Sequence, residues 1–186
     1  MKSIVKYLSI AIVLGFMSCN PKNNSESNET ATSSTEEPGT GQSGVKDDVS
    51  NPNIVQVASG SKDHTTLVAA VKAAELVDAL SNVGPFTVFA PTNAAFDKLP
   101  AGTVEGLLKP EKKADLQGIL EYHTYVGNLK IEYIQDGQEY ETVNGAKIKI
   151  TKIGDKVMVN GKATIVATIP TANGIIHVID EVLLPK

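Results

Sequence analysis

The chain contains no arginine and no tryptophan, and only one of its 186 residues is a cysteine. All 17 basic residues are therefore lysines, set against 21 acidic residues, for a formal net charge of −4 at pH 7. Nucleic-acid-binding proteins usually concentrate positive charge and use the planar guanidinium group, so this composition argues against a nucleic-acid partner. A single cysteine excludes an intrachain disulfide framework and any multi-cysteine metal or iron–sulfur site.

That one cysteine directly follows a short apolar run near the N-terminus. Residues 8–17 form an apolar stretch interrupted by one serine, and two lysines precede it. Ten residues are too few to span the ~30 Å hydrocarbon core of a membrane, but they suit the apolar region of a secretory signal peptide. The pair Ser18-Cys19 resembles the cleavage and acylation site of bacterial lipoproteins. This resemblance implies a signal peptide over residues 1–18 and a lipid on Cys19; the alternative is an ordinary secretory peptide with an incidental cysteine.

Residues 19–49 have the composition of a disordered linker. They are rich in Asn, Ser, Thr, Glu and Gly, and residues 20–49 carry six acidic residues against two lysines, a net charge of −4. A segment with so few apolar side chains cannot bury enough surface to offset the entropy lost on folding. As a flexible coil of about 30 residues it would span roughly 30 Å on average. We therefore expect a tether that holds a folded domain, residues 50–186, away from a membrane.

The first half of this domain predicts helices around one buried strand. A short helix is expected from Ile54, and Asp63 is a plausible N-cap for the next helix, whose apolar face continues to Leu80. Residues 86–90 are β-prone and have apolar side chains on both faces, which is typical of a buried strand. Three further helices are expected: one capped by Thr92, one over residues 103–108, and one with Pro110 in its first turn.

The second half predicts antiparallel strands. Apolar and polar residues alternate over residues 146–151, and Asn160-Gly161 is a strong signal for a two-residue hairpin turn. Pro170 and Asn173-Gly174 are expected to bound a loop before the last apolar stretch. The further strands are expected over residues 156–159, 163–168 and 175–184. Helices followed by hairpins indicate the α+β class.

Four segments resemble those of the fasciclin-like domain family. FTVFAPTNAAF (residues 86–96) and NGIIHVIDEVLLP (residues 173–185) resemble its two sequence blocks, and ILEYHTYVG (residues 119–127) resembles its central Tyr-His segment. HTTLVAAVKAAELVDAL (residues 64–80) resembles its first helical pair, so the similarity covers about residues 52–186. It implies a compact wedge in which N-terminal helices pack on a twisted, mostly antiparallel β-sheet. It also implies a secreted or surface-bound protein that serves in adhesion and matrix contacts.

Asp180 directly follows the apolar residues of the second block and precedes Glu181. A buried carboxylate needs hydrogen-bond donors. We therefore expect Asp180 to act as a structural latch that accepts hydrogen bonds from the first block, at the corner formed by Thr92.

Tyr122 and His123 are the candidate interaction residues. Tyr-His motifs in animal members of the family have been linked to integrin-type adhesion, and the resemblance extends to these two positions alone. A histidine on the apolar side of a helix is more often a hydrogen-bonded core residue, so packing is the favoured role for His123.

The residues point to no catalytic, cofactor or metal site. A zinc site would need His64, His123 and His177 with Asp63 or Asp180, but no pair has HxxxH or HExxH spacing. The favoured alternative places His64 at a cap or surface, His123 in the core and His177 on an outward strand face. No serine lies in a Gly-x-Ser-x-Gly elbow, and no glycine-rich phosphate loop is present.

These observations predict a non-enzymatic adhesion or matrix-interaction module without a cofactor. It would be lipid-anchored in the cell envelope, in the outer membrane, facing either the periplasm or the outside. The expected partners are a protein or polysaccharide of the cell surface or matrix, with the membrane touched only through the N-terminal lipid; weak homo-oligomers are left open. The alternative function is a periplasmic or surface carrier of a small apolar ligand.

Overall fold

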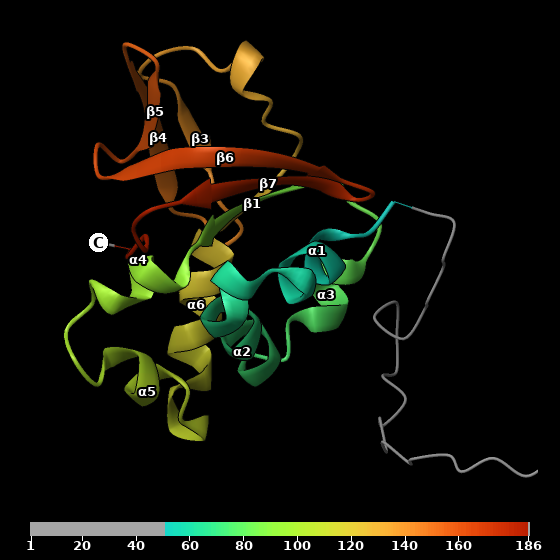
Figure 1. Ribbon diagram of the computed structural model, residues 1–186, viewed down its shortest axis with the longest axis vertical. Coiled ribbons are helices and arrows are strands. Elements are labelled where there is room, and N and C mark those ends of the chain that lie inside the picture. Colours follow the sequence, from blue (N-terminus) through green and yellow to red (C-terminus); the bar gives the residue numbers. More distant parts are fainter. Residues whose placement is uncertain (1–50, 186) are drawn as a thin grey trace, which may run out of the picture. The chain divides into compact units, whose positions relative to one another are not determined.

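The computed structural model describes residues 51–185 (Figure 1). The expected signal peptide, Cys19 and the expected linker lie outside these residues. Within them, the helices precede most of the strands, in agreement with the predicted α+β class.

Short helices form the first half of the described chain. They are α1 (Ile54–Gly60), η2 (Lys62–His64), α2 (Thr65–Ala73), α3 (Val77–Ser81), α4 (Asn93–Asp97), α5 (Thr103–Leu107), η3 (Pro110–Lys112) and α6 (Lys113–Tyr122). Thr92 caps α4 as predicted, because its side chain accepts a hydrogen bond from the N–H of Ala95. Asp63 is not the cap that the sequence suggested: Ser61 accepts the N–H of Asp63 and begins a 3₁₀ turn. The continuous apolar face also breaks, because Glu75 adopts a left-handed conformation (φ 57°) between α2 and α3.

Seven strands form one mixed sheet in the order β2-β1-β7-β6-β5-β4-β3. Their bounds are β1 (Phe86–Pro91), β2 (Thr124–Val126), β3 (Glu139–Glu141), β4 (Lys147–Ile153), β5 (Lys156–Val159), β6 (Ala163–Thr171) and β7 (Gly174–Ile179), with the 3₁₀ turn η4 (Ile131–Tyr133) before β3. β1 and β7 run parallel, and the other neighbouring strands run antiparallel. This parallel pair joins the two sequence blocks, since β1 lies in residues 86–96 and β7 in residues 173–185.

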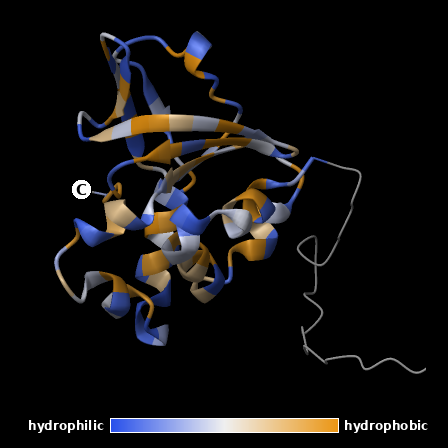
Figure 2. Cartoon of the chain, viewed as in Figure 1, coloured by the Kyte–Doolittle hydropathy of each residue, from blue (hydrophilic) through white to orange (hydrophobic). Residues whose placement is uncertain are grey.

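The central strands β1 and β7 are buried on both faces. In β1, Val88 and Ala90 pack with apolar side chains of α1, α2 and α6 in one core cluster. Phe89 faces the opposite way, into a second cluster with apolar side chains of β4, β5 and β6. In Figure 1 the helices lie on one side of the β1–β7 pair and strands β3–β5 on the other, and Figure 2 shows hydrophobic residues in both parts. The buried strand predicted from apolar residues on both faces is confirmed.

Strand β6 is longer, and the strand after it shorter, than the sequence pattern suggested. Pro170 lies inside β6 and not in a loop, and the connecting turn is Ala172-Asn173. A proline is tolerated there because β5 pairs with β6 only through Ala163 and Thr164, so residues 165–171 have β7 as their only strand partner in the described structure. β7 ends at Ile179, and the residues after it continue without regular structure.

The two edge strands of the sheet approach each other. The N–H of Val143, two residues after β3, donates to the carbonyl of Thr124 at the start of β2 at 2.9 Å. The Tyr122 hydroxyl, from the end of α6, donates to the carbonyl of Lys147 in β4 at 3.3 Å. The sheet is therefore nearly closed around the second core cluster.

Candidate functional site

His123 lies at the point where the helices, the sheet and the C-terminal segment meet. It follows the last residue of α6 and is 3% exposed. Its Nδ1 donates to the carbonyl of Ile119 at 2.8 Å, and its Nε2 accepts the N–H of Leu183 at 2.9 Å. These partners require the neutral ring with the proton on Nδ1. Burial lowers the pKa of His123 to about 4, although the hydrogen bond to Ile119 opposes this shift.

An apolar groove lies beside His123, under residues 181–185, which we name the C-terminal strap. It encloses about 470 Å³ of empty space, including the part open to solvent. Val182 and Leu184 of the strap line one side, and side chains of α4, α5 and α6 line the other. The hydrogen bond from Leu183 to His123 holds the strap at its middle. We name this the strap groove; its lining is Leu67, Pro91, Phe96, Leu99, Val104, Leu107, Leu108, Leu116, Ile119, Leu120, His123, Val182 and Leu184.

A second groove lies on the other side of the same side chains, between α1, α2, α3 and the sheet. It encloses about 560 Å³, again including open solvent, and shares Leu67, Leu120 and His123 with the strap groove. Lys72 and Thr124 are the polar members of its lining besides His123. Both grooves are lined mainly by apolar side chains, with His123 in both and Lys72 in the second.

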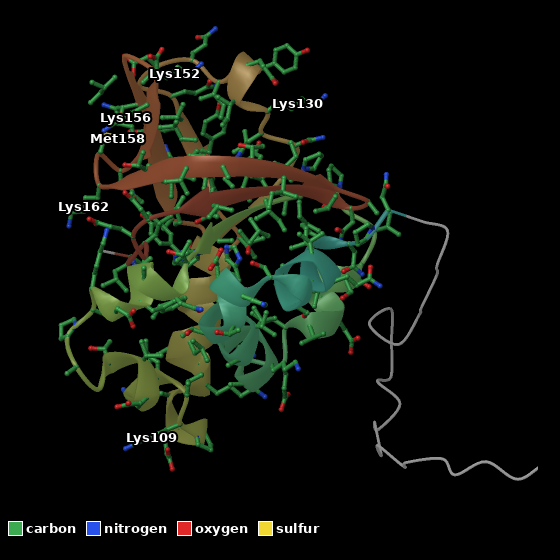
Figure 3. All side chains as sticks on the ribbon, in the orientation of Figure 1. Lys109, Lys130, Lys152, Lys156, Met158 and Lys162 are labelled. Atoms are coloured by element: carbon green, nitrogen blue, oxygen red, sulfur yellow. The ribbon has the colours of Figure 1, made fainter. Side chains whose placement is uncertain are left out.

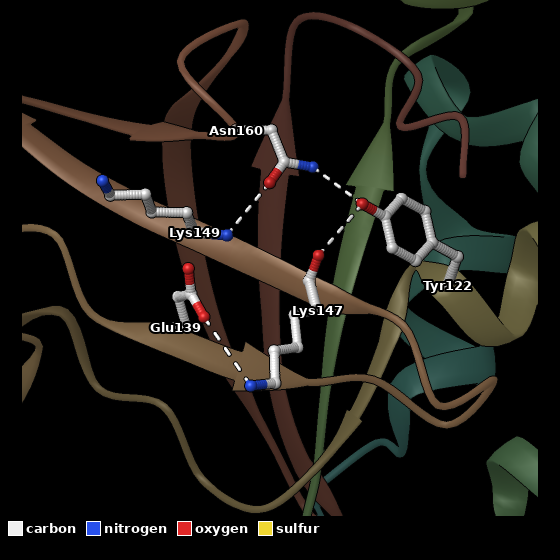
Figure 4. A network of polar contacts seen from close by, with 5 residues as sticks. All are labelled: Tyr122, Glu139, Lys147, Lys149 and Asn160. Atoms are coloured by element: carbon white, nitrogen blue, oxygen red, sulfur yellow. Dashed lines mark hydrogen bonds and ion pairs between the residues drawn. The ribbon is translucent and has the colours of Figure 1, made fainter. Parts of the chain in front are cut away.

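Tyr122 belongs to a structural network, which Figure 4 shows. The Tyr122 hydroxyl donates to the Lys147 carbonyl and accepts a hydrogen bond from Nδ2 of Asn160 at 2.9 Å. The Oδ1 of Asn160 accepts the N–H of Lys149 at 2.9 Å, which ties the β5–β6 turn to β4. Tyr122 is 4% exposed. The structure therefore places both candidate interaction residues, Tyr122 and His123, in the interior, and their contacts are those of the packing role.

Asp180 has a different partner from the one that the sequence suggested. Its Oδ1 accepts the backbone N–H of Thr164 at the start of β6 at 2.6 Å, not a donor of the Thr92 corner. The reason is the sheet order, because β6 and not the α4 corner is the antiparallel neighbour of β7. The Thr92 corner is joined to the same place through the backbone, since the N–H of Thr92 donates to the Ile179 carbonyl at 3.2 Å. Nζ of Lys98 donates to the Asp180 carbonyl at 2.8 Å.

The other two histidines are also buried: His64 is at the N-cap position of α2, one of the two places that the sequence suggested, but is not on the surface, and His177 does not face outward. His177 is fully buried in β7, where Nε2 donates to the Leu129 carbonyl at 2.7 Å and Nδ1 contacts the Thr168 hydroxyl at 2.9 Å. The outward position expected for His177 is wrong because residues 127–134 cover that face of the sheet through Leu129 and Ile134. His64 is 5% exposed, and its Nδ1 contacts the Ser61 hydroxyl at 2.8 Å. Burial lowers the pKa of both rings.

No three potential metal ligands come together within residues 51–185. In that same part of the chain, no helix is long and apolar enough to cross a membrane. The geometry of the described residues thus offers two apolar grooves and an exposed surface, on which Figure 3 labels several lysines of the β4–β5 region.

The sequence pattern missed the strap groove and the role of Asn173. The groove is assembled from residues far apart in the chain, so no local pattern reveals it. Asn173 was expected only to border a loop, but its Oδ1 accepts the N–H of Ile54 and its Nδ2 donates to the carbonyls of Leu80 and Asn82. Its signals in the sequence were its place at the start of the second block and before Gly174, a position where the structure shows that a Cβ would overlap the Phe86 carbonyl.

Comparison with known proteins gives consistent matches. The sequence model described as the Fasciclin domain matches residues 62–185. Protein sll1483 of Synechocystis sp. is 52% identical over 132 residues, which cover 71% of this chain and 73% of that protein. The cell surface glycolipoprotein MPB83 of Mycobacterium bovis is 39% identical over 137 residues, covering 71% of this chain and 60% of that protein. Human periostin is 39% identical over 124 residues, 66% of this chain but 15% of periostin.

One solved structure shows the same arrangement of helices and strands. It is a FAS1 domain pair from the insect cell adhesion molecule Fasciclin I, with a TM-score of 0.64 over 72% of this chain and 51% of that chain. The sequences are 18% identical, so this likeness concerns the fold alone. The helices and the mixed, nearly closed sheet described above constitute the FAS1 fold.

Proposed function

Because the chain belongs to the fasciclin domain family, we propose that it is a non-catalytic contact module displayed on a bacterial cell envelope. A lipid on Cys19 anchors it in the outer membrane, and residues 19–49 form its tether. The observation that carries this proposal is the 39% identity with a cell surface glycolipoprotein, in a chain whose only cysteine follows a short apolar run. The insect protein that has the same fold is a cell adhesion molecule, and adhesion is the kind of contact that we propose here.

The contact surface is the outside of the folded domain. The three histidines are buried, and Tyr122 and His123 are occupied by internal hydrogen bonds. The partner is a protein or polysaccharide of the cell surface or matrix. If each domain binds its partner weakly, many copies on one membrane bind together with a much higher avidity. Weak self-association of the domain would raise this avidity further.

The anchor is tested by labelling cells with radioactive palmitate and treating intact cells with protease. We expect the wild-type chain to carry label, to sediment with membranes and to be shaved from the cell surface. A Cys19→Ser variant should lose the label and leave the membrane fraction. If the domain is protected from protease until the outer membrane is broken, contact with another cell is excluded.

Adhesion is tested by comparing cells that carry the wild-type chain, no chain, or the Cys19→Ser variant on a matrix-coated surface. We expect retention to fall for both altered strains, since the released domain no longer links the cell to its support. Equal retention of the three strains would contradict the proposed function.

The strap groove supports a second candidate, a carrier of a small apolar ligand. Its lining is apolar apart from His123, whose ring nitrogens already have partners. Val104→Trp should fill the groove and abolish binding of a hydrophobic dye without lowering the unfolding temperature. Val143→Trp, at an exposed position away from the groove, is the matched control. Equal dye binding by both variants would remove the carrier hypothesis.

A further inference from the structure

One end of the domain is formed by segments that contain exposed apolar side chains and no charged residue. Four segments meet there: residues 51–53, 82–85, 126–128 and 172–173. They are joined by hydrogen bonds from Ala172 N–H to the Pro52 carbonyl, from Asn173 Nδ2 to the Asn82 carbonyl, and from Gly127 N–H to the Pro85 carbonyl. We name this surface the charge-free end.

Two valines project from the charge-free end. Val83 is 90% exposed and Val126 is 63% exposed, and both stand beside exposed prolines or asparagines. No acidic residue or lysine occurs in residues 49–61, 79–96, 122–129 or 163–179, which supply these segments and their flanks. In a chain where one residue in five is charged, four adjoining segments without a charged residue are a distinct feature.

The described chain begins at this same end. Asn51 starts it, and Pro52 is bonded to the β6–β7 turn, whereas Lys152, Lys156 and Lys162 lie near the β4–β5 end of the sheet (Figures 1 and 3). The chain therefore enters the described domain at the charge-free end, after the 50 residues that precede Asn51 in the sequence. If they lead to an acylated Cys19, this end is the one that the tether draws toward the bilayer.

We infer that the charge-free end rests on the lipid surface of the membrane that holds the anchor, with Val83 and Val126 dipping into the headgroup region. This inference rests on the proposed lipid anchor. A bilayer is the occupant that we favour: bacterial lipids are mostly anionic or zwitterionic, and the segments that form this end contain no carboxylate to be repelled and no lysine to be desolvated, the nearest charged residues in the sequence being Asp48, Asp78 and Lys130.

The contact is weak by itself and becomes significant only through the tether. With two exposed valines as its apolar contacts, a domain without its tether would bind the lipid surface with a dissociation constant no lower than about the millimolar range. A flexible tether supplies an effective concentration in that same range, so an anchored domain spends a large part of its time on the membrane. The lysines near the β4–β5 end then point away from the membrane, toward a partner.

The test uses the full lipidated chain in vesicles of phosphatidylethanolamine and phosphatidylglycerol. Cys19 is the only cysteine and its thiol is acylated in this form, so Val83→Cys supplies a single site for an environment-sensitive fluorophore. Ile153→Cys is the matched control, because Ile153 is also exposed, at 64%, but lies in the β4–β5 hairpin. We expect the label at 83 to shift to shorter wavelength and to be quenched by a spin-labelled lipid, and the label at 153 to do neither.

A second pair of variants separates apolar contact from mere proximity. With the label on Val126→Cys, the additional change Val83→Asp should abolish the shift while the chain still floats with the vesicles. Failure of the chain to float would show that the anchor itself is wrong, and the inference would fall with it. Flotation with equally solvated labels at 83 and 153 would overturn the inference alone, as would a shift at 83 that needs no vesicles and grows with protein concentration.

Discussion

Asn173 connects three parts of the fold through one side chain. It holds the first N–H of α1 and the carbonyls of Leu80 and Asn82 at the end of α3, while its backbone carbonyl accepts the N–H of Phe86. Asn173→Ala keeps the backbone bond to Phe86 but leaves the Ile54 N–H and the carbonyls of Leu80 and Asn82 without their side-chain partner, at a position that is 9% exposed. We expect a loss of about 3 kcal/mol in the free energy of unfolding, measured by denaturant titration with circular dichroism. Asn128→Ala, at an exposed position, is the control; if the two variants unfold alike, the connecting role is wrong.

In the structure, the latch formed by Asp180 is its hydrogen bond with Thr164, and this bond can be tested by substitution. Because its carboxylate accepts the Thr164 N–H at the β6–β7 border, Asp180→Ala should lower the free energy of unfolding by about 1–3 kcal/mol. Asp180→Asn keeps an acceptor at this position and should cost less. A thermal unfolding midpoint of Asp180→Ala equal to that of the wild type would remove the latch.

His123 predicts how stability changes with pH. The folded protein binds a proton at His123 only near pH 4, whereas the unfolded chain binds it near the ordinary pKa of 6.5. The neutral ring thus stabilises the fold fully above pH 6.5, and this stabilisation is lost as the pH falls from 6.5 toward 4, by about 3 kcal/mol. His123→Gln, which can keep one donor and one acceptor, should flatten the pH dependence of the unfolding free energy over that interval.

The same measurement distinguishes packing from contact. His64→Gln is the control, since burial also lowers the pKa of His64 but its ring lies outside both grooves. If His123→Gln loses adhesion while its unfolding curve matches the wild type at every pH, the ring serves recognition and not packing.

At the scale of elements, β6 shows how the fold limits self-association. Its residues 165–171 pair only with β7 in the described structure, and Pro170 removes one N–H from the strand. Free strand edges are templates for pairing with another chain, and proline on such an edge opposes this. We expect Pro170→Val to associate at lower protein concentration than the wild type in analytical ultracentrifugation. The control is Pro100→Val, at an exposed site outside the sheet, which should associate no more readily than the wild type. If Pro170→Val also associates no more readily than the wild type, Pro170 is not what protects this strand edge.

The same strand shows where local sequence reasoning ends. Alternation predicted the strand over residues 146–151 within two residues of β4, and capping chemistry predicted the α4 start at Thr92. Those signals are local. The pattern around Pro170 favours a loop because nothing local reveals that β5 departs from β6 after Thr164. β2 and β3 contain three residues each, too few for a period to be recognised.

The sequence indicated which residues of the candidate site have a role, but not which groups they contact in the fold. Asp180 was singled out because a carboxylate in an apolar run needs hydrogen-bond donors, and Tyr122 and His123 because they resemble the Tyr-His segment of the family; all three have internal partners. Apart from the Ile119 carbonyl, which is four residues from His123, their partners lie 16 to 60 residues away in the chain. The outward position expected for His177 failed for the same reason, since Leu129, 48 residues away, covers it.

For the whole molecule, β1 and β7 have a double role that predicts cooperative unfolding. One face of the pair belongs to the helical core and the other to the sheet core, so neither core survives loss of the other. Leu116→Ala on the helical side and Ile148→Ala on the sheet side should each cost about 2–5 kcal/mol. Both variants should unfold in a single transition with an unchanged dependence on denaturant, whether followed by far-ultraviolet circular dichroism or by tyrosine fluorescence.

Non-coincident transitions in Ile148→Ala would mean that the sheet core melts alone and that the helical half, with its strap groove, is an independent unit. In that case the surface offered to a partner could change without loss of the domain, whereas one shared transition means that both grooves and the charge-free end belong to one cooperative unit.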